Sequence, residues 1–321
     1  MLRILISDNV AEICATTLGD KGIEVEFSPG MAVDVLKQRI GDFDGLIVRS
    51  ATKVTDEIIQ SAANLKVIGR AGAGIDNIDL AAATEKGIAV FNAAAANTIS
   101  AAEHTFALML ALARKIPQAH YSLACEKWNR NAFKGVELFE KTLGVIGLGK
   151  IGRELASRAK AFGMKIVAYD PLIPPELFRS VGAERLELND LVRHSDFITM
   201  HVPLNSATKH LIGAEQLNLA KKGLLLINTS RGGIIDESAL LTALTAGNIA
   251  GAALDVYEKE PPRGSPLLKL NNVVLTPHLG ASTIEAQQRV ALQIAETVAD
   301  FLLESKAENI LNPEAVCQKY S

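Results

Sequence analysis

Short apolar runs alternate with amphipathic stretches from the start of the chain to Asn92. The runs are typical of buried strands and the stretches of surface helices. Such alternation favours right-handed crossovers and a parallel sheet, so we expect an α/β domain here. The expected strands are Arg3–Ser7, Ile23–Phe27, Gly45–Arg49, Lys66–Gly69 and Ile88–Asn92, with helices near residues 10–20, 32–40, 55–63 and 79–86.

The segment from Thr98 to Ile116 is apolar on nearly every side, which is typical of a helix buried on most faces. Its Ser100-Ala-Ala-Glu103 reads as a capping box. In an otherwise soluble chain, we expect such an apolar helix to be buried between two domains or between two subunits.

The strand and helix alternation restarts at Lys141, which places a domain boundary near residues 96–100. Ser282-Thr-Ile-Glu285 reads as the capping box of a last helix that runs to about Glu304. The expected strands of this second part are Leu143–Ile146, Lys165–Tyr169, Asp196–His201, Leu224–Asn228, Ala250–Asp255 and Asn272–Thr276.

Gly147, Gly149 and Gly152 form a G-x-G-x-x-G between an apolar run and a helical segment. The first glycine permits a tight turn, the second lets a pyrophosphate approach the backbone, and the third lets the helix pack closely on the strand. Asp170 ends the next apolar run, near the position of an acid that binds an adenosine ribose. The pattern predicts dinucleotide binding, with NAD favoured over NADP because Asp170 would repel a 2′-phosphate. A purely structural turn is the alternative.

Composition narrows the function classes. The chain has 321 residues, of which 48% are hydrophobic and 21% charged, so it can bury two cores and is not disordered. A net charge of −3 gives no general attraction to nucleic acid or membrane. Cys14, Cys125 and Cys317 lack metal-ligand spacing, and Phe106–Ala113 is too short to cross a bilayer. With no signal-peptide pattern at the N-terminus, we expect a soluble cytoplasmic protein without a metal.

Polar residues follow three strands of the second expected sheet, at the edge where parallel strands place their ligands. They are Arg231, one of Glu258 and Glu260, and His278. Taken singly, each is as readily a solvated arginine, a charged turn or a structural histidine. Together they can act as an alcohol oxidoreductase: the histidine takes the hydroxyl proton, a carboxylate fixes its tautomer, and the arginine holds a substrate carboxylate.

Several motifs then show a family resemblance that covers nearly the whole chain. The chain resembles the D-isomer-specific 2-hydroxyacid dehydrogenases, and among them the branch that oxidises 3-phospho-D-glycerate. Besides the glycine motif, the resemblance rests on Gly45-Leu-Ile-Val-Arg49-Ser50, Gly69-Arg70-Ala-Gly72-Ala-Gly74-Ile-Asp-Asn, Ser230-Arg231-Gly-Gly, Ala252-Ala-Leu-Asp255-Val, Glu260-Pro-Pro and Pro277-His278-Leu-Gly280.

The resemblance implies an α/β fold of two doubly wound parallel-sheet domains. Residues 97–280 would form a Rossmann NAD-binding domain, and residues 1–96 plus 281–321 a smaller flavodoxin-like substrate domain. It implies that Arg231, Glu260 and His278 are catalytic, which selects Glu260 over Glu258. The implied cofactor-binding residues are Gly147, Gly149, Lys150, Ile151, Gly152, Asp170, Thr229 and Asp255.

The expected substrate is an anionic 2-hydroxy acid that carries a phosphate. The resemblance implies substrate contacts at Arg49, Ser50 and Gly72. Arg70 also falls at a strand end, where a second arginine can bind the additional negative charge of the phosphate. We expect a homodimer or homotetramer that uses the helix 98–116. Basic residues of the following loop would reach a neighbouring subunit's site; they are Lys127, Arg130 and Lys134.

Two departures from the family pattern matter. Asn92-Ala-Ala-Ala-Ala-Asn97 stands where the family shows Asn-x-Pro-x-x-Asn, so this hinge is expected to be more helical than usual and to lack a substrate or nicotinamide contact made there. The chain also ends at Ser321, without the C-terminal regulatory domains of some relatives, so serine feedback is expected to be absent.

The leading hypothesis is NAD-dependent oxidation of 3-phospho-D-glycerate to 3-phosphohydroxypyruvate, which begins serine synthesis. Hydroxypyruvate or glyoxylate reduction, or sulfolactate oxidation, would use the same chemistry on another acid. A third possibility is a non-enzymatic, NAD-sensing corepressor-like module. S-adenosylmethionine binding is a remote fourth, since it leaves Arg231, Glu260 and His278 without a role.

Overall fold

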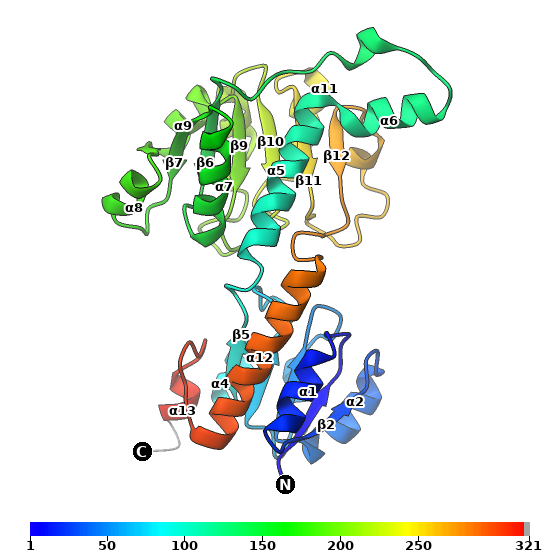
Figure 1. Cartoon of the computed structure of the whole chain (residues 1–321), viewed down its shortest axis with the longest axis vertical. Coiled ribbons are helices and arrows are strands. Elements are labelled where there is room, and N and C mark those ends of the chain that lie inside the picture. Colours follow the sequence, from blue (N-terminus) through cyan, green and yellow to red (C-terminus); the bar gives the residue numbers. More distant parts are fainter. Residues whose placement is uncertain (318–321) are drawn as a thin grey trace. The chain divides into compact units, whose positions relative to one another are not determined.

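The computed structural model describes residues 1–317 and divides into two compact units. Unit 1 is Met1–Asn97 together with the chain from Ala281 onward, and unit 2 is Thr98–Gly280. Each unit has one sheet in which neighbouring strands pair in parallel. The expected fold class, two doubly wound parallel-sheet domains, is confirmed (Figure 1).

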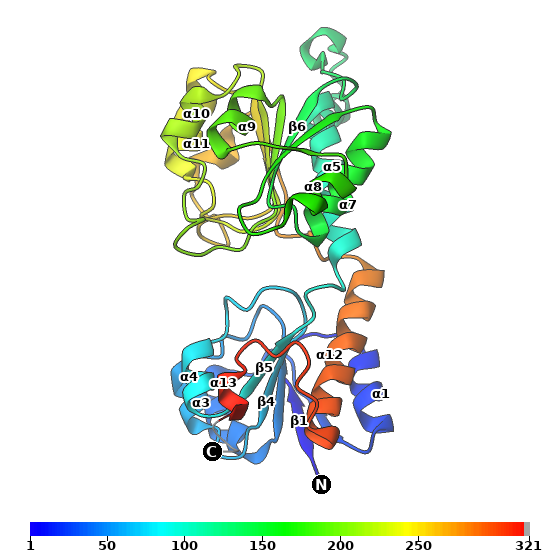
Figure 2. The same ribbon diagram turned by 90° about the vertical axis from the view of Figure 1, so that its left-hand side faces the viewer.

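Unit 1 has a five-stranded sheet of order β2-β1-β3-β4-β5, the flavodoxin-like order. Helices α3 and α4 cover one face and α1 and α12 the other (Figure 2). The elements are β1 (Arg3–Ile6), α1 (Ile13–Asp20), β2 (Glu24–Phe27), α2 (Val33–Arg39), η1 (Ile40–Asp42), β3 (Gly45–Val48), α3 (Asp56–Ser61), β4 (Val67–Arg70), α4 (Leu80–Glu85), β5 (Ala89–Asn92), α12 (Ile284–Glu304) and α13 (Glu314–Cys317).

Unit 2 has a seven-stranded sheet of order β12-β11-β10-β9-β6-β7-β8, with helices on both faces (Figure 2). Strand β8 has two residues and was not expected, because so short a run carries no hydrophobic pattern. The elements are α5 (Thr98–Arg114), α6 (Ile116–Ala124), η2 (Arg130–Phe133), β6 (Thr142–Ile146), α7 (Lys150–Ala161), β7 (Lys165–Tyr169), α8 (Pro175–Ser180), β8 (Glu184–Arg185), α9 (Leu188–His194), β9 (Phe197–Met200), α10 (Ala214–Leu219), β10 (Leu225–Asn228), α11 (Glu237–Ala246), β11 (Gly251–Leu254), η3 (Pro266–Lys269) and β12 (Val273–Leu275).

The last part of the described chain belongs to unit 1. Helix α12 packs against α1 and β4, and its buried side is a stripe of small and branched residues. Beyond it, the buried Asn312 accepts a hydrogen bond from Val90 N–H (2.8 Å) and donates one to Ile88 O (2.9 Å). These bonds tie the returning segment to β5.

Helix α5 is buried on most sides, as its composition predicts, and it lies across one face of the unit 2 sheet beside α7 (Figure 1). Its start differs from the expectation. Ser100 is not a cap, because the helix begins at Thr98 and the Ser100 hydroxyl donates to Gly280 O (2.9 Å). Helix α12 is capped by Thr283, whose side chain accepts from Ala286 N–H (3.1 Å), rather than by Ser282.

The alanine run before α5 is a turn and not the helical hinge that was expected. Ala96 N–H bonds to Ala93 O at 3.3 Å, and the regular helix begins only at Thr98. Alanine has the highest helix propensity, but Ala93 N–H donates to Gly72 O (2.9 Å), so a tertiary contact and not propensity sets the conformation at the start of this run.

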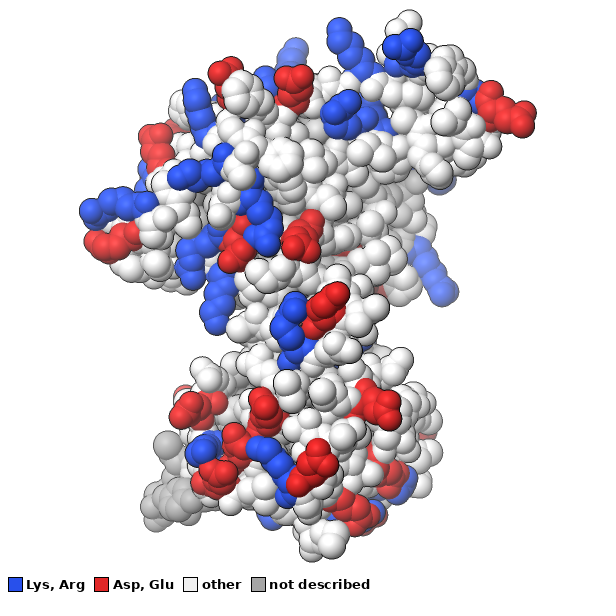
Figure 3. Space-filling model, in the orientation of Figure 1, with Lys and Arg blue, Asp and Glu red and all other residues white. Residues whose placement is uncertain are grey.

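The remaining expectations from composition concern thiols, metals and membranes. Cys14 is buried, and burial raises the pKa of its thiol to about 12; Cys125 is exposed, and the side chain of Cys317 lies outside what the structure describes. Among residues 1–317, no cluster of His, Cys, Asp and Glu has the arrangement of a metal site. No helix in that range is long and apolar enough to cross a bilayer. On the face shown in Figure 3, each unit carries both acidic and basic side chains.

Candidate active site

The glycine motif forms the turn between β6 and α7. Gly147 has φ +88° and lies so close to the end of the neighbouring strand β9 that a Cβ would stand 2.6 Å from His201 O. A Cβ on Gly152 would stand 2.2 Å from Gly147 O, so the helix reaches the turn only because this residue is glycine. Strand β6 lies between β7 and β9, where the strand order reverses, and ligands bind at that point in open α/β sheets.

The space in front of this turn is open. Apart from Gly149 itself and its two chain neighbours, no described residue has a heavy atom within 4 Å of the position that a Cβ on Gly149 would take. Arg153 N–H bonds to Gly149 O (3.0 Å), so the amides of Lys150 and Ile151 belong to the open first turn of α7. Such an open helix start binds anions such as a pyrophosphate.

Asp170 lies where the sequence places the ribose-binding acid. It follows β7, and its carboxylate accepts hydrogen bonds from Leu148 N–H (2.9 Å) and Leu172 N–H (3.0 Å). Asp170 is therefore fixed directly beside the glycine turn. Since a carboxylate also has lone pairs for ribose hydroxyls, the residues present suit NAD.

Arg231, Glu260 and His278 occupy the loops that follow β10, β11 and β12, three neighbouring parallel strands. Two of them are brought into contact: His278 Nδ1 lies 2.8 Å from Glu260 Oε2. Glu260 Oε1 also accepts from Tyr257 N–H (3.2 Å). In this pair, the Nδ1 atom of His278 is held by a carboxylate that the Tyr257 backbone fixes in place.

The two candidate glutamates have different partners. Glu258 accepts from Glu237 N–H (3.1 Å) and lies 3.2 Å from His210 Nε2, whereas Glu260 contacts His278. Burial of Glu260 raises its pKa, but the hydrogen bond and charge of His278 outweigh burial and keep the pKa below its usual range. Glu260 is thus a carboxylate at neutral pH.

A second histidine, His201, also ends a strand of this sheet but has different properties. Burial lowers the pKa of His201 to about 4. Its Nε2 lies 3.1 Å from Thr199 Oγ1. His201 is therefore neutral at pH 7, whereas His278 is exposed and paired with an anion.

The loop that carries His278 is held from below by Asp255. His278 has φ +56°, an uncommon conformation for a residue with a side chain, so its surroundings must hold it in place. Asp255 accepts from Leu279 N–H (2.7 Å) and Gly280 N–H (2.9 Å). The side chain of Asp255 has no exposed surface and supports this loop, and its implied cofactor contact stays a prediction.

Two residues that sequence reasoning missed complete this support. His104 Nε2 lies 3.1 Å from Asp255 Oδ1, and Thr276 Oγ1 donates to the same oxygen at 2.6 Å. Burial raises the pKa of Asp255, but the hydrogen bonds, led by those from His104 and Thr276, outweigh burial and keep this pKa below its usual range. His104 lies inside α5, where no sequence pattern marks it as polar support.

Arg231 is positioned by close packing between two loops. A Cβ on Gly232 would stand 1.8 Å from Tyr257 O, so the loop after β10 lies directly on the loop after β11. Asn228 Nδ2 donates to Arg231 O (2.8 Å), and the Arg231 guanidinium donates to Ser230 O (2.7 Å). Thr229, expected at the cofactor, lies nearby with its hydroxyl 2.6 Å from that of Thr105.

The expected substrate residues lie together at one edge of the unit 1 sheet. Arg49 and Ser50 follow β3, and Arg70 ends β4. Gly72 has φ +151°, a conformation that residues with a side chain rarely adopt, and a Cβ there would stand 1.7 Å from the present position of the Arg70 guanidinium. The strand order reverses between β1 and β3, so this edge is also the ligand-binding point of its sheet.

Comparisons with known proteins agree with both units. Residues 106–280 match the family described as D-isomer specific 2-hydroxyacid dehydrogenase, NAD binding domain. The chain is 52% identical over 320 residues to D-3-phosphoglycerate dehydrogenase of Methanocaldococcus jannaschii, covering 99% of this chain and 61% of that protein. It spans about three fifths of the length of the curated relatives it matches.

Solved structures match almost the whole chain. The TT0316 protein from Thermus thermophilus is 33% identical with a TM-score of 0.89, covering 97% of this chain and 100% of that one. D-lactate dehydrogenase from Aquifex aeolicus, solved with NAD and lactic acid, is 29% identical with a TM-score of 0.85, covering 96% and 99%.

Proposed function

The chain belongs to the D-isomer specific 2-hydroxyacid dehydrogenases, and from this premise we propose that it oxidises 3-phospho-D-glycerate to 3-phosphohydroxypyruvate with NAD. The observation that carries the chemistry is the hydrogen bond between His278 Nδ1 and Glu260 Oε2. The choice of substrate is supported by the similarity of nearly all of this chain to proteins named D-3-phosphoglycerate dehydrogenase. This activity would supply the first step of serine biosynthesis.

The glycine turn and Asp170 would hold the NAD, which accepts the hydride from C2 of the hydroxy acid. His278 removes the hydroxyl proton. Because Glu260 accepts the hydrogen on Nδ1, Nε2 keeps its lone pair for the substrate. When Nε2 takes the proton, the imidazolium is stabilised by the ionised Glu260. In the reverse direction the same imidazolium returns the proton to the carbonyl oxygen.

Arg231 would bind the carboxylate of the substrate, which is attached to the reacting carbon C2. Its guanidinium can hold a carboxylate through two parallel hydrogen bonds, and its charge favours the developing carbonyl dipole. The packing of Gly232 on Tyr257 keeps this loop beside the one that carries Glu260.

Arg49 is assigned to the substrate phosphate, and its replacement tests the substrate proposal. We expect Arg49→Ala to raise KM for 3-phospho-D-glycerate about 10- to 100-fold, because a hydrogen bond to a charged group contributes about 1.5–3 kcal/mol. KM for D-glycerate, which lacks the phosphate, should change little. The measurement is the rate of NAD reduction at 340 nm with each acid.

Lys53→Ala is the matched control, since this exposed base follows the same strand only four residues later. Equal losses for both acids in Arg49→Ala would remove Arg49 from phosphate recognition. Reduction of NAD with D-glycerate but not with the phosphorylated acid would contradict the proposed substrate.

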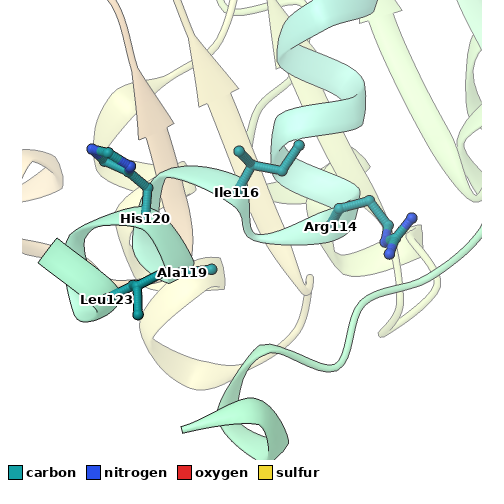
Figure 4. Close-up of a pocket in the computed structure, with 5 residues that line it drawn as sticks. All are labelled: Arg114, Ile116, Ala119, His120 and Leu123. Carbon is teal, nitrogen blue, oxygen red and sulfur yellow. The ribbon is translucent and has the colours of Figure 1, made fainter. Parts of the chain in front are cut away.

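We further propose that the partner of this chain is a second copy of itself. Helix α6 has no buried residue, and its Ile116, Tyr121 and Leu123 are exposed together with Trp128. Ile116 and Leu123 also line an open pocket with Arg114, Ala119 and His120 (Figure 4). An apolar surface of this kind is typical of protein interfaces. We place the contact here rather than on α5, whose apolar residues are mostly buried within unit 2.

The arm after α6 projects from unit 2 (Figure 1), and its basic residues are exposed. In a symmetric pair each arm lies against the other copy, which would let Lys127, Arg130 and Lys134 approach the partner's anionic substrate.

Leu123→Asp is expected to convert a dimer into a monomer, because it places a charge in the apolar surface of α6. Sedimentation velocity at micromolar concentration measures the change. Leu172→Asp is the control, since Leu172 is 90% exposed in unit 2 but lies far from α6 in the chain. A wild-type monomer, or equal dissociation of both variants, would contradict the assignment.

A further inference from the structure

A buried carboxylate lies directly under the loop that carries Arg49 and Ser50. Asp8 follows β1 and is only 3% exposed. Its carboxylate accepts hydrogen bonds from the backbone N–H of Arg49 (2.6 Å), Ala51 (3.2 Å) and Thr52 (3.1 Å). It also accepts from the Thr52 hydroxyl at 2.6 Å. The Asp8 side chain thus accepts hydrogen bonds from three of the four backbone N–H groups of residues 49–52.

The acceptors of the same loop are held by Asn77. Its Nδ2 donates to Arg49 O (2.9 Å) and to Thr52 O (2.6 Å). Ser7 Oγ lies 3.1 Å from Thr52 Oγ1 and adds a further link to β1. The N–H groups of Arg49, Ala51 and Thr52 and the C=O groups of Arg49 and Thr52 are therefore all bound, which restricts the backbone conformation of residues 49–52.

This hydrogen-bond network lies at the ligand-binding edge of the unit 1 sheet. Asp8 follows β1 and the loop follows β3, the two neighbouring strands between which the chain order reverses. That reversal is where ligands bind in such sheets. The Arg49 side chain is partly exposed and Ser50 is exposed, so both are presented outward while their backbone is fixed from behind.

A carboxylate is the group that this network requires. It offers two oxygens that only accept, whereas an amide would turn one NH2 group toward the backbone N–H donors. A buried negative charge beside an anion-binding loop is tolerated because the donors of the loop itself satisfy it.

We infer that Asp8, supported by Asn77, is a positioning residue that orients Arg49 and Ser50 toward the anionic end of the substrate. Asp8 does not touch the substrate itself. This inference rests on the proposed function, since the anionic end is taken to be the phosphate of 3-phospho-D-glycerate.

The test is Asp8→Asn compared with Asp44→Asn. Asp44 is a matched control because it joins the same two strands at their opposite ends, where it accepts from Arg3 N–H (2.9 Å) and Lys66 Nζ (2.9 Å). Asp8→Asn should raise KM for 3-phospho-D-glycerate at least tenfold, with kcat and KM for NAD within twofold. Its effect on KM for D-glycerate should be much smaller, and Asp44→Asn should leave every KM unchanged.

Hydrogen–deuterium exchange gives a second readout that does not depend on turnover. Asp8→Asn should accelerate exchange in peptides that contain residues 49–52, and Asp44→Asn should not. If Asp8→Asn fails to fold, Thr52→Val removes only the 2.6 Å hydroxyl donor and should give the same pattern with a smaller KM change.

The outcomes separate the two proposals. A wild-type enzyme that does not turn over 3-phospho-D-glycerate contradicts the proposed function, and the exchange comparison then decides the role of Asp8. A wild-type enzyme that does turn it over, with equal KM changes in Asp8→Asn and Asp44→Asn or with unchanged exchange at 49–52, overturns the inference.

Discussion

Replacement of His278 by glutamine is expected to lower kcat about 10²- to 10⁴-fold, the contribution typical of a positioned general base. Glutamine can still hydrogen-bond to Glu260, which lies 2.8 Å from His278 Nδ1, but it cannot take a proton. Binding of NADH should stay within twofold of the wild type, because the glycine turn and Asp170 lie on other strands. Steady-state rates and a fluorescence titration with NADH measure the two effects.

His210→Gln is the matched control. His210 also has a positive φ (+51°) and is also paired with a glutamate, Glu258, at 3.2 Å. His210 lies well beyond the end of β9 at Met200 and does not contact Glu260 in the way that His278 does, so we expect its replacement to leave kcat near the wild-type value. If His278→Gln kept more than a tenth of the activity, or if both variants lost equally, His278 would not be the proton acceptor.

Replacement of Arg231 by alanine is expected to reduce kcat/KM about 10²- to 10³-fold, the loss seen when one group that stabilises developing charge is removed. Arg231→Lys should recover only part of this loss, because lysine keeps the charge but lacks the planar fork that binds a carboxylate through two hydrogen bonds. The measurement is kcat/KM for 3-phospho-D-glycerate in the two variants.

Arg263→Ala controls for the loss of a nearby positive charge, since Arg263 is exposed in the loop after β11. It should retain nearly all activity. Full activity in Arg231→Lys would show that charge alone is needed, and full activity in Arg231→Ala would exclude a role in substrate binding.

The fold was predictable because its signal is local. Each strand of unit 1 is a short apolar run between amphipathic helices, and the observed strands begin or end within about two residues of the expected ones. The exceptions have physical reasons. Strand β8 is too short to carry a pattern, and Ser100-Ala-Ala-Glu103 matches a capping box although Thr98 already begins the helix. A capping motif specifies side-chain types but not whether the preceding backbone is helical.

The candidate site was predictable only in part. The strand-end rule points to Arg231 and His278, because the carboxyl ends of parallel strands meet at one edge. The rule cannot show which way a side chain points. Asp255 follows a strand yet faces inward, and Asp8 follows β1 but serves the loop of another strand through contacts that join residues over forty positions apart. Such contacts exist only in the folded chain.

The most direct test of the central claim is the oxidation of NADH by the purified protein with one of four 2-oxo acids at equal concentration. The acids are 3-phosphohydroxypyruvate, hydroxypyruvate, glyoxylate and sulfopyruvate. We predict fast oxidation with 3-phosphohydroxypyruvate and at least tenfold slower oxidation with the others. Preference for another acid would contradict the proposed substrate while keeping the chemistry, and no oxidation with any of the four would contradict the assignment of Arg231, Glu260 and His278 as an active site.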